Sequence, residues 1–337
     1  MEKTHYRYQE ISIFHQILFS LIIFFLILLL LSTYCKLSIG WNKSNVCLNG
    51  KTILITGGNS GLGYQTALIL ASRGAKIILA DKNDLTQSKK NIIQETKNNK
   101  IITKYVDLAS FDTIKILAKE IIEEEDRLDV LINNAGISGY FPGFTKDGLQ
   151  LLMQVNHFGP FLLTHLLVPL LKKSTPSRII FVSSIVAFTP LIFNLDLNED
   201  PQSVIGKNIH YSRSKLYNDI ISIGFAEKLK GTGVTCNSLN PGLVKTPLLT
   251  SALNMRGINF FSHVLNVAIY LFGKTPYEGA QTHAYLAMAE EVKNITGGFF
   301  SDCKEWGHPR ITRDKLICEK VWKASEQFIM LSSKDKL

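Results

Sequence analysis

The sequence lacks the cysteine spacings that mark metal sites and disulfide frameworks. Its five cysteines include no CxxC pair, and none stands at metal-ligand spacing from a histidine. Their odd number also argues against a set of structural disulfides. We therefore expect neither a metal site nor a disulfide scaffold.

The sequence also lacks a cluster of basic residues, although its formal charge is +9. Lysine and arginine are scattered and interleaved with acidic residues, whereas a nucleic-acid-binding surface gathers basic residues on one face or one helix. The sequence shows no repeat with a period of 20–50 residues, which a solenoid would have. Composition therefore argues against a nucleic-acid partner and against a repeat protein.

An apolar run near the N-terminus has the length of a membrane span. Residues 17–35 carry no charge, and a stretch of about 19 residues is close to the ~20 that a helix needs to cross a bilayer. A cleaved signal peptide is the alternative, because Lys3 and Arg7 precede the run. The length of the run and the poor placement of small residues for cleavage favour an uncleaved, single-pass anchor.

Other boundaries follow from this interpretation. Residues 1–16 are expected as a short tail before the anchor, whose orientation stays open because lysines stand on both sides. A second apolar segment, 259–272, is too short to span a bilayer. It is expected as a lid or a membrane-surface helix.

The rest of the chain alternates short β-branched runs with longer amphipathic stretches, which predicts an α/β fold. A single domain of about 250 residues with appendages fits the 337-residue length as well as two domains do. We predict one doubly wound parallel sheet, a Rossmann fold, over 50–305, followed by a tail over 306–337. The expected strands are 52–56, 76–80, 101–106, 130–133, 178–182 and 233–238, and the expected helices include 64–73, 111–125, 149–171 and 211–230.

A glycine-rich turn directly follows the first expected strand and opens a helix. Glycine lets such a turn bend sharply and approach a pyrophosphate, whose charge is met by N–H groups at the helix N-terminus. A glycine cluster alone indicates only a turn, but this position between strand and helix favours a dinucleotide cofactor. The candidate residues are Gly57, Asn59, Ser60, Gly61, Leu62 and Gly63.

Asp81 ends the second expected strand, about 20 residues further on, where an acid can meet the ribose hydroxyls of the cofactor. A carboxylate there would repel a 2′-phosphate, so Asp81 favours NAD(H). Lys82 could instead attract that phosphate, which keeps NADP(H) open. A simple turn role for Asp81 is the alternative.

Tyr211 and Lys215 are four residues apart, so on a helix both project from one face. A nearby ammonium lowers the pKa of a phenol, which can then exchange a proton with an alcohol or a carbonyl. The spacing alone is weak, because Tyr270 and Lys274 repeat it. We expect Tyr211 to open a long helix after a strand-end serine pair, a context that Tyr270 lacks, so we interpret Tyr270 as structural.

The serine pair is Ser183-Ser184, which follows the fifth expected strand. Ligands of parallel sheets sit at the carboxyl ends of strands, so the Ser184 hydroxyl can bind the reacting oxygen there. A serine that closes a strand is more often only a turn former.

Taken together, these motifs resemble the short-chain dehydrogenase/reductase family. The glycine turn, Asn133-Asn134-Ala135-Gly136, Ser184, the Tyr211-x3-Lys215 pair and Asn240-Pro241-Gly242 occur in the family's order, over about residues 51–302. The resemblance implies hydride transfer between a nicotinamide cofactor and an alcohol/carbonyl pair. The catalytic residues it implies are Asn156, Ser184, Tyr211 and Lys215.

The resemblance also implies cofactor contacts. Asp107 would meet the adenine ring, Asn133 and Gly136 would run along the cofactor, and Thr246 would meet the carboxamide. Lys215 would bind the nicotinamide ribose as well as lower the tyrosine pKa, while Asn156 would hold a proton-relay water. The remaining cofactor candidates are Leu108, Ala135, Tyr211, Pro241, Gly242 and Val244.

Within the family, the sequence is most similar to the retinol dehydrogenase-like group, which acts on lipophilic alcohols and aldehydes, commonly at the endoplasmic reticulum. This similarity rests on the segments 145–148, 274–280 and 299–303, together with the apolar N-terminus. Tyr64 departs from the group, because many NADP-using relatives have lysine there. A non-catalytic nucleotide sensor or membrane scaffold is the alternative function. The exact alcohol, the direction of the reaction and the oligomeric state, including a homo-oligomer, stay open.

Overall fold

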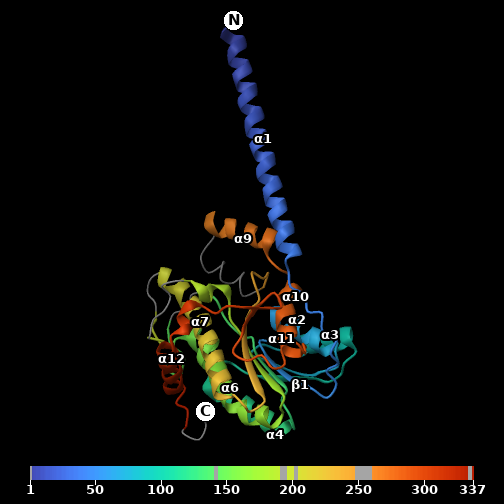
Figure 1. The fold of residues 1–337 in the computed structure, drawn as a ribbon, viewed down its shortest axis with the longest axis vertical. Coiled ribbons are helices and arrows are strands. Elements are labelled where there is room, and N and C mark those ends of the chain that lie inside the picture. The colour runs from blue at the N-terminus through green and yellow to red at the C-terminus, as the bar shows by residue number, and fades with distance from the viewer. Residues whose placement is uncertain (1, 140–142, 190–195, 201–203, 247–259, 333–335) are drawn as a thin grey trace.

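The chain folds around one eight-stranded sheet with helices on both faces, and a long helix leaves the domain at the N-terminus (Figure 1). The computed structural model describes all residues except 1, 140–142, 190–195, 201–203, 247–259 and 333–335. The strand order is β3-β2-β1-β4-β5-β6-β7-β8, parallel except for the last pair. The strands are β1 (Thr52–Thr56), β2 (Lys76–Asp81), β3 (Ile101–Tyr105), β4 (Val130–Asn133), β5 (Ser177–Val182), β6 (Val234–Asn240), β7 (Phe299–Ser301) and β8 (Lys304–Trp306).

This sheet confirms the predicted doubly wound fold, and all six expected strands are present. Alternate side chains of β1 point to opposite faces of the sheet: Leu54 packs into the core on one face, whereas Ile53 and Ile55 pack into the core on the other. A central parallel strand is covered on both sides, so its sequence reads as a continuous apolar run. The three-residue strands β7 and β8 were not predicted.

The helices form a layer on each face. Helices α2, α3 and α11 cover one face, and α4, α6, α7 and α12 contribute to the core on the other. The helices are α1 (Glu2–Leu37), α2 (Gly61–Ala71), α3 (Thr86–Thr96), α4 (Phe111–Glu124), α5 (Leu151–Met153), η1 (Gln154–Phe158), α6 (Gly159–Lys173), η2 (Ile185–Phe188), α7 (Val204–Lys228), α9 (Phe260–Phe272), α10 (Pro276–Gly279), α11 (Gln281–Met288), η3 (Arg310–Arg313) and α12 (Lys315–Phe328).

Two expected helices differ from the observed ones. Helix α7 begins at Val204, so Tyr211 lies two turns inside it and does not open it. The helix expected over 149–171 is observed as α5, η1 and α6, with a π-turn at Gln154–Phe158. Both differences affect the site, because they set where Tyr211 and Asn156 lie.

The C-terminal residues 306–337, expected as a tail, include α12, which packs on α7. Trp322 is 5% exposed, and its ring occupies the space beside Gly224, where a β-carbon would lie 2.5 Å from the indole. Ser325 of the same helix contacts the buried His157 at 2.8 Å. Part of the segment predicted as a tail therefore packs on the domain, where Trp322 and Ser325 contact residues of α7 and η1.

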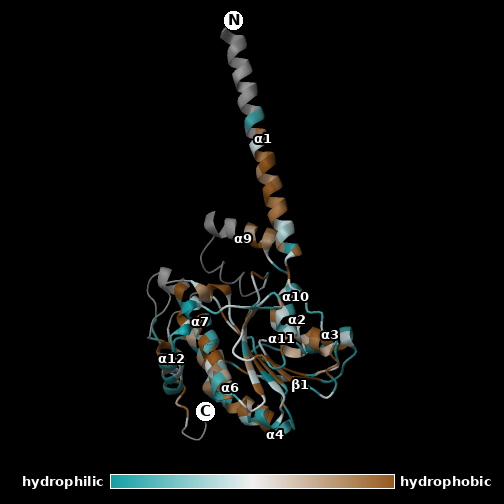
Figure 2. Ribbon diagram, in the orientation of Figure 1, coloured by the Kyte–Doolittle hydropathy of each residue, from teal (hydrophilic) through white to brown (hydrophobic). Residues whose placement is uncertain are grey.

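Helix α1 extends away from the domain, and Figure 2 shows its apolar stretch next to the domain. Leu18–Leu37 has the length and composition to cross a membrane, and none of it is buried. Leu151–Lys173 passes the same test, but it is a core helix because 83% of it is buried. The segment predicted as a short tail, residues 1–16, belongs to α1 as well, from Glu2 onward.

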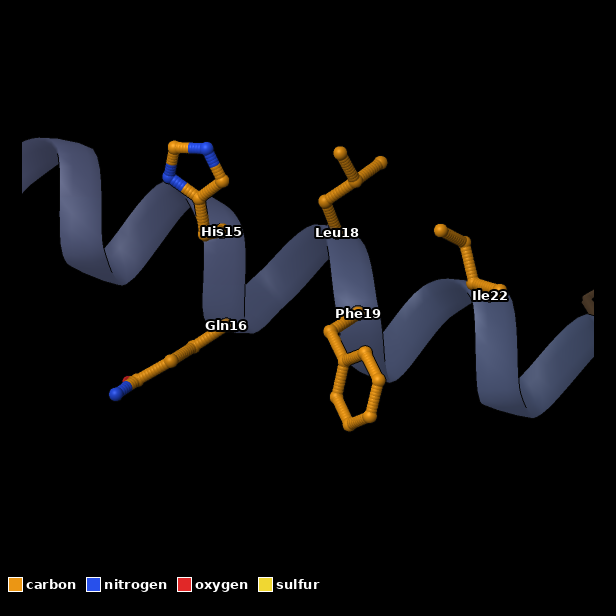
Figure 3. A pocket seen from close by; sticks show the side chains of 5 residues that line it. All are labelled: His15, Gln16, Leu18, Phe19 and Ile22. Atoms are coloured by element: carbon orange, nitrogen blue, oxygen red, sulfur yellow. The ribbon is translucent and has the colours of Figure 1, made fainter.

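A shallow hollow lies on α1 where polar residues give way to its apolar stretch. Figure 3 shows that all of its lining residues come from α1: His15, Gln16, Leu18, Phe19 and Ile22. One helix cannot enclose a ligand on several sides, as small-molecule sites do. We therefore do not interpret this hollow as a substrate site.

The linker between α1 and β1 is docked on the domain. Gly40 N–H donates to the Asp302 carboxylate at 2.9 Å, and Leu48 N–H donates to the Arg73 carbonyl at 2.8 Å. A β-carbon at Gly40 would lie 1.8 Å from the Asp302 carbonyl oxygen, so the linker can approach this closely only with glycine there. The end of α1 is therefore held close to the domain.

Candidate active site

The glycine turn connects β1 to α2 and has the geometry of an anion cradle. Gly57 and Gly61 have φ angles of +69° and +57°, which side chains disfavour. A β-carbon at Gly63 would lie 2.2 Å from the Gly57 carbonyl oxygen. Ser60 caps α2 without a side-chain bond, and the first turn of α2 carries no acidic residue. The positive end of α2 can therefore receive a pyrophosphate, which fits a dinucleotide cofactor.

Two residues outside the predicted site hold this turn in place. The Asn134 side-chain amide donates to the carbonyls of Thr56 and Gly57, at 2.8 and 3.3 Å. The Thr56 hydroxyl accepts from the N–H groups of Asn134 and Ala135, both at 3.1 Å. The ends of β1 and β4 are thus fastened together. The only sequence signal for this was the second asparagine of the Asn133-Asn134 pair.

Asp81 lies beside the glycine turn, as its position at the end of β2 predicted. One carboxylate oxygen accepts from Asn59 N–H at 3.2 Å, and the other accepts twice from Asn83, at 3.0 Å each. The side chain is partly exposed, and Lys82 is exposed. Asp81 is therefore bonded to the glycine turn and helps to order it.

The ends of β3 and β4 supply the next candidates. Asp107 accepts from Ala109 N–H at 3.0 Å in a local turn, and Leu108 beside it is buried. The side chain of Asn133 turns into the core and donates to Thr164 at 2.9 Å. Only the backbone of Asn133 therefore lies along the sheet edge where a cofactor would run.

Gly136 meets two of the predicted catalytic residues. A β-carbon placed on it would lie 3.2 Å from Asn156 Oδ1 and 3.4 Å from Lys215 Nζ. The Asn156 side chain pairs with the backbone of Ile137, accepting from its N–H and donating to its carbonyl, and it also donates to Ser214 Oγ. The loop after β4, Asn156 and Lys215 therefore meet at one point.

The π-turn η1 places Asn156 and frees its carbonyl. Pro160 stands four residues later and has no N–H, so the usual α-helical donor to the Asn156 carbonyl is missing. That carbonyl instead accepts from Asn218 Nδ2 of α7 at 2.8 Å. π-turns are frequent at functional sites. Pro160 is the sequence signal that could have predicted this break.

Tyr211 and Lys215 project from one face of α7 toward the end of β5. Lys215 is 3% exposed, and its Nζ donates to the Val182 carbonyl at 3.0 Å and lies 5.7 Å from the centre of the Tyr211 ring. The Ser183 hydroxyl donates to the Lys215 carbonyl at 2.7 Å. The first serine of the pair thus fastens α7 to β5, a role that the sequence did not indicate.

Burial shifts the pKa values of the couple in opposite directions. Although Tyr211 is partly exposed, its surroundings desolvate the phenol and raise its pKa to about 12. Burial lowers the pKa of Lys215 to about 8. The expected lowering of the tyrosine pKa by lysine is absent from this arrangement, because desolvation dominates and Nζ is bonded to Val182.

Ser184 lies directly after β5 and is partly exposed. Its hydroxyl oxygen accepts from Val186 N–H at 3.4 Å, which caps the short helix η2. A hydroxyl that accepts in this way can still donate its own proton. The structure therefore shows Ser184 in its predicted role as a turn former, and its hydroxyl proton stays available for the predicted contact with a reacting oxygen.

The segment after β6 forms the far side of the site. Asn240 Oδ1 accepts from Gly242 N–H and from Ile185 N–H, which joins this loop to the one after Ser184. Val244 is buried and bridges to Lys274, and Thr246 is the last described residue before 247–259. The predicted residues Pro241, Gly242, Val244 and Thr246 thus follow one another at the carboxyl edge of the sheet.

The repeated Tyr-x3-Lys spacing has a different environment. Lys274 Nζ donates to Asp302 at 2.7 Å and to the Pro241 carbonyl at 3.2 Å, while Tyr270 is 76% exposed. Lys274 therefore supports the loop that carries Pro241 and Gly242. Among the described residues, no group of three or more His, Cys, Asp or Glu side chains could hold a metal ion.

Comparisons with known proteins agree with this geometry. A family model described as short chain dehydrogenase matches residues 51–196. Mouse retinol dehydrogenase 14 is 38% identical over 303 residues, covering 84% of this chain and 86% of that protein. Human retinol dehydrogenase 13 is 38% identical over 292 residues, covering 86% of this chain and 88% of that protein.

Solved structures show the same fold. The oxidoreductase yciK from Escherichia coli matches with a TM-score of 0.62 and 26% identity, over 78% of this chain and 98% of that one. A protein described as a short chain dehydrogenase from Escherichia coli CFT073, complexed with NADPH, matches with a TM-score of 0.60 and 26% identity, over 77% and 99%. The chain therefore belongs to the short-chain dehydrogenase/reductase family, in its retinol dehydrogenase-like group, and is an NAD(P)-dependent oxidoreductase.

Proposed function

We propose that this protein transfers a hydride between NAD(P) and a lipophilic alcohol/carbonyl pair, with Tyr211 as general acid/base. The observation that carries the proposal is the meeting of Tyr211, Lys215, Asn156 and Gly136 at the carboxyl ends of β4 and β5. Ligands of open α/β sheets bind at that edge. A structural cluster would not require a buried lysine beside a tyrosine there.

The roles follow from the contacts. The cofactor, when bound, supplies or accepts the hydride. The Ser184 hydroxyl donates to the reacting oxygen and steadies its developing charge, while Tyr211 transfers the proton. Lys215 provides the positive charge that a tyrosinate needs, and Asn156 positions the loop at Gly136 and supports the proton relay.

The protonated and deprotonated forms of Tyr211 serve opposite directions of the reaction. A phenol with a pKa of about 12 is protonated at neutral pH, which is the form that donates to a carbonyl. Removing a proton from an alcohol requires a lower pKa, which a charged Lys215 close to the phenol would provide. Because a catalyst lowers both barriers equally, these states set the pH dependence of each direction and not the equilibrium.

The proposed substrate is apolar and reaches the enzyme from a membrane. The curated relatives are named for retinol, a lipophilic alcohol. Helix α1 carries a 20-residue apolar span with no buried part, which we propose as a single-pass anchor, in the endoplasmic reticulum by analogy with the group. Retinoid, sterol, terpenoid and polyprenoid alcohols all match this chemistry. We propose that the segment from Ser184 to Tyr211 and the apolar region after Thr246 contact the substrate. Parts of both, 190–195, 201–203 and 247–259, lie outside the described residues.

A panel assay tests the proposal. The full chain in membranes or detergent is given NAD, NADP or their reduced forms with retinoid, sterol and polyprenoid alcohols or carbonyls, and absorbance at 340 nm is followed. We expect turnover of at least one lipophilic pair. Cofactor binding without any turnover across the panel would instead support the alternative of a nucleotide sensor or scaffold.

We predict that Asp81 sets the cofactor preference toward NAD(H). Replacing it by Asn removes the charge that repels a 2′-phosphate but keeps an oxygen to accept from Asn59 N–H. The ratio of kcat/KM for NADP to that for NAD should rise about tenfold or more, since tenfold corresponds to about 1.4 kcal/mol. Asp84→Asn is the matched control, because it removes the same charge three residues away and should leave the ratio unchanged. An unchanged ratio in Asp81→Asn would refute the assignment.

A further inference from the structure

Helix α9 is an uncharged helix on the outside of the domain. Its thirteen residues, Phe260–Phe272, include no Asp, Glu, Lys or Arg. In Figure 1 it lies across the base of α1, and Figure 2 shows the described part of it as apolar. Ile269 is buried against the protein, whereas Val267 and Tyr270 are 57% and 76% exposed. One side of α9 therefore packs on the protein, and the other presents Val267 and Tyr270 outward together with the polar Asn266.

The C-terminal end of α9 is bonded to the domain-proximal end of α1. Ser32 Oγ donates to the Leu271 carbonyl at 2.7 Å, and Lys36 Nζ donates to the Gly273 carbonyl at 3.3 Å. Lys36 also pairs with Glu278 at 2.8 Å. A helix rises 1.5 Å per residue, so Ser32 lies about 8 Å along the axis from the end of the apolar span at Leu37. These contacts place α9 at the depth where a span leaves a bilayer.

We infer that α9 lies in the interface of the same bilayer that α1 crosses and forms a second membrane contact of the domain. The inference rests on the proposed role of α1 as an anchor. An apolar helix held within the last turns of a span meets the boundary of headgroups and acyl chains, where interfacial helices bury about 5–10 Å deep. Val267 faces the acyl chains, and Tyr270 has the amphipathic ring that is enriched at this depth.

The cations around α9 suit the headgroup region. Lys245 Nζ lies 4.9 Å from the centre of the Tyr270 ring and donates to the Tyr270 carbonyl at 2.9 Å. Lys36 lies at the other contact with α1. Both ammonium groups stand at the edge of the apolar surface, as lysines do near the ends of membrane segments. Continuity with α1 thus favours lipid over a second copy of this chain as the occupant.

The same contacts connect the membrane surface to the cofactor site. Lys274, two residues after α9, donates its N–H to the Leu243 carbonyl at 2.7 Å and accepts from Lys245 N–H at 2.9 Å. Its Nζ donates to the Pro241 carbonyl. The loop that begins with Pro241 and Gly242 is therefore tied to the end of α9. The edge of the sheet that carries the site faces the bilayer.

A fluorescence experiment on the full chain tests the inference. Val267→Cys, in a Cys47→Ser background, is labelled with nitrobenzoxadiazole and reconstituted in phosphatidylcholine vesicles, and the emission of the labelled background is subtracted. Phe25→Cys on α1 is the lipid-exposed reference, with 64% exposure in the chain. Ile116→Cys on α4, at 56% exposure, is the matched control away from α9. Quenching is measured with spin-labelled phosphatidylcholine and with aqueous iodide.

We expect the label at 267 to lose emission to the lipid quencher as the label at 25 does, and to be shielded from iodide, while the label at 116 behaves in the opposite way. Iodide quenching at 267 with lipid quenching retained at 25 would overturn the inference and leave the anchor standing. Absence of lipid quenching at 25 would remove the anchor and the inference together. Shielding of 267 from both quenchers, dependent on protein density, would assign α9 to contact between copies and also overturn it.

Discussion

Replacing Tyr211 by Phe is expected to lower kcat by at least about 100-fold, and up to about 10⁴-fold, because general acid/base groups contribute rates of that size. The change removes one oxygen and keeps the ring beside Lys215, whose Nζ is held by the Val182 carbonyl and not by the phenol. The dissociation constant of NAD(H), measured by fluorescence titration, should stay within about twofold of the parent, a difference of about 0.4 kcal/mol. Activity is measured with the best pair from the substrate panel.

The chain offers a matched control for this variant. Tyr270 has the same spacing to a lysine, but its ring is 76% exposed and Lys274 bonds to Asp302 and Pro241. Tyr270→Phe should therefore keep kcat near the parent value. Comparable losses in both variants would show that a missing hydroxyl acts through general destabilisation, and retained activity in Tyr211→Phe would sink the proposed mechanism.

Replacing Gly63 by Ala is expected to weaken cofactor binding by more than tenfold, which corresponds to about 1.4 kcal/mol or more. The new β-carbon would lie 2.2 Å from the Gly57 carbonyl oxygen and 2.6 Å from Asn134 Nδ2. Neither the backbone of the turn nor the amide that fastens it can stay in place. The turn must open, and its N–H groups then no longer converge on a pyrophosphate.

Gly307→Ala is the control for this change, because a β-carbon there meets nothing within 4 Å. Cofactor dissociation constants are measured by titration, and melting temperatures without cofactor show whether Gly63→Ala still folds. Equal cofactor affinity in a folded Gly63→Ala variant and in the control would show that the cofactor does not sit on this turn.

The sheet could be predicted because its signals are local. Buried parallel strands such as β1 are short apolar runs, and the glycine turn can be recognised from its position between a strand and a helix. The order of the motifs along the chain then placed Ser184 at the end of β5, and Tyr211 and Lys215 on a helix after it. Strands β7 and β8 could not be predicted, because three residues are too few to show the alternation of apolar and polar residues that marks a strand.

The contacts that adjust the site could not be predicted, because they join distant residues. The bond of Lys215 to Val182 and the desolvation of Tyr211 depend on how closely α7 approaches β5. The sequence therefore indicated an activated phenol, whereas the folded chain shows one with a raised pKa. In contrast, Pro160 is a local signal, and its effect on Asn156 could have been deduced.

Because α12 packs against α7, the core between these helices cannot be complete until α12 has been synthesised. Trp322 and Ser325 belong to α12, which is synthesised after η1 and α7, yet they complete the core beside His157 and Gly224 of those elements. Translation of residues 38–337 takes about 15–60 s at ~5–20 residues per second. Helix α1, which is proposed to enter the membrane, is therefore synthesised long before the core around α7 can be completed. A chain that stops shortly before α12 would therefore carry the apolar span of α1 but lack the side chains that complete this core.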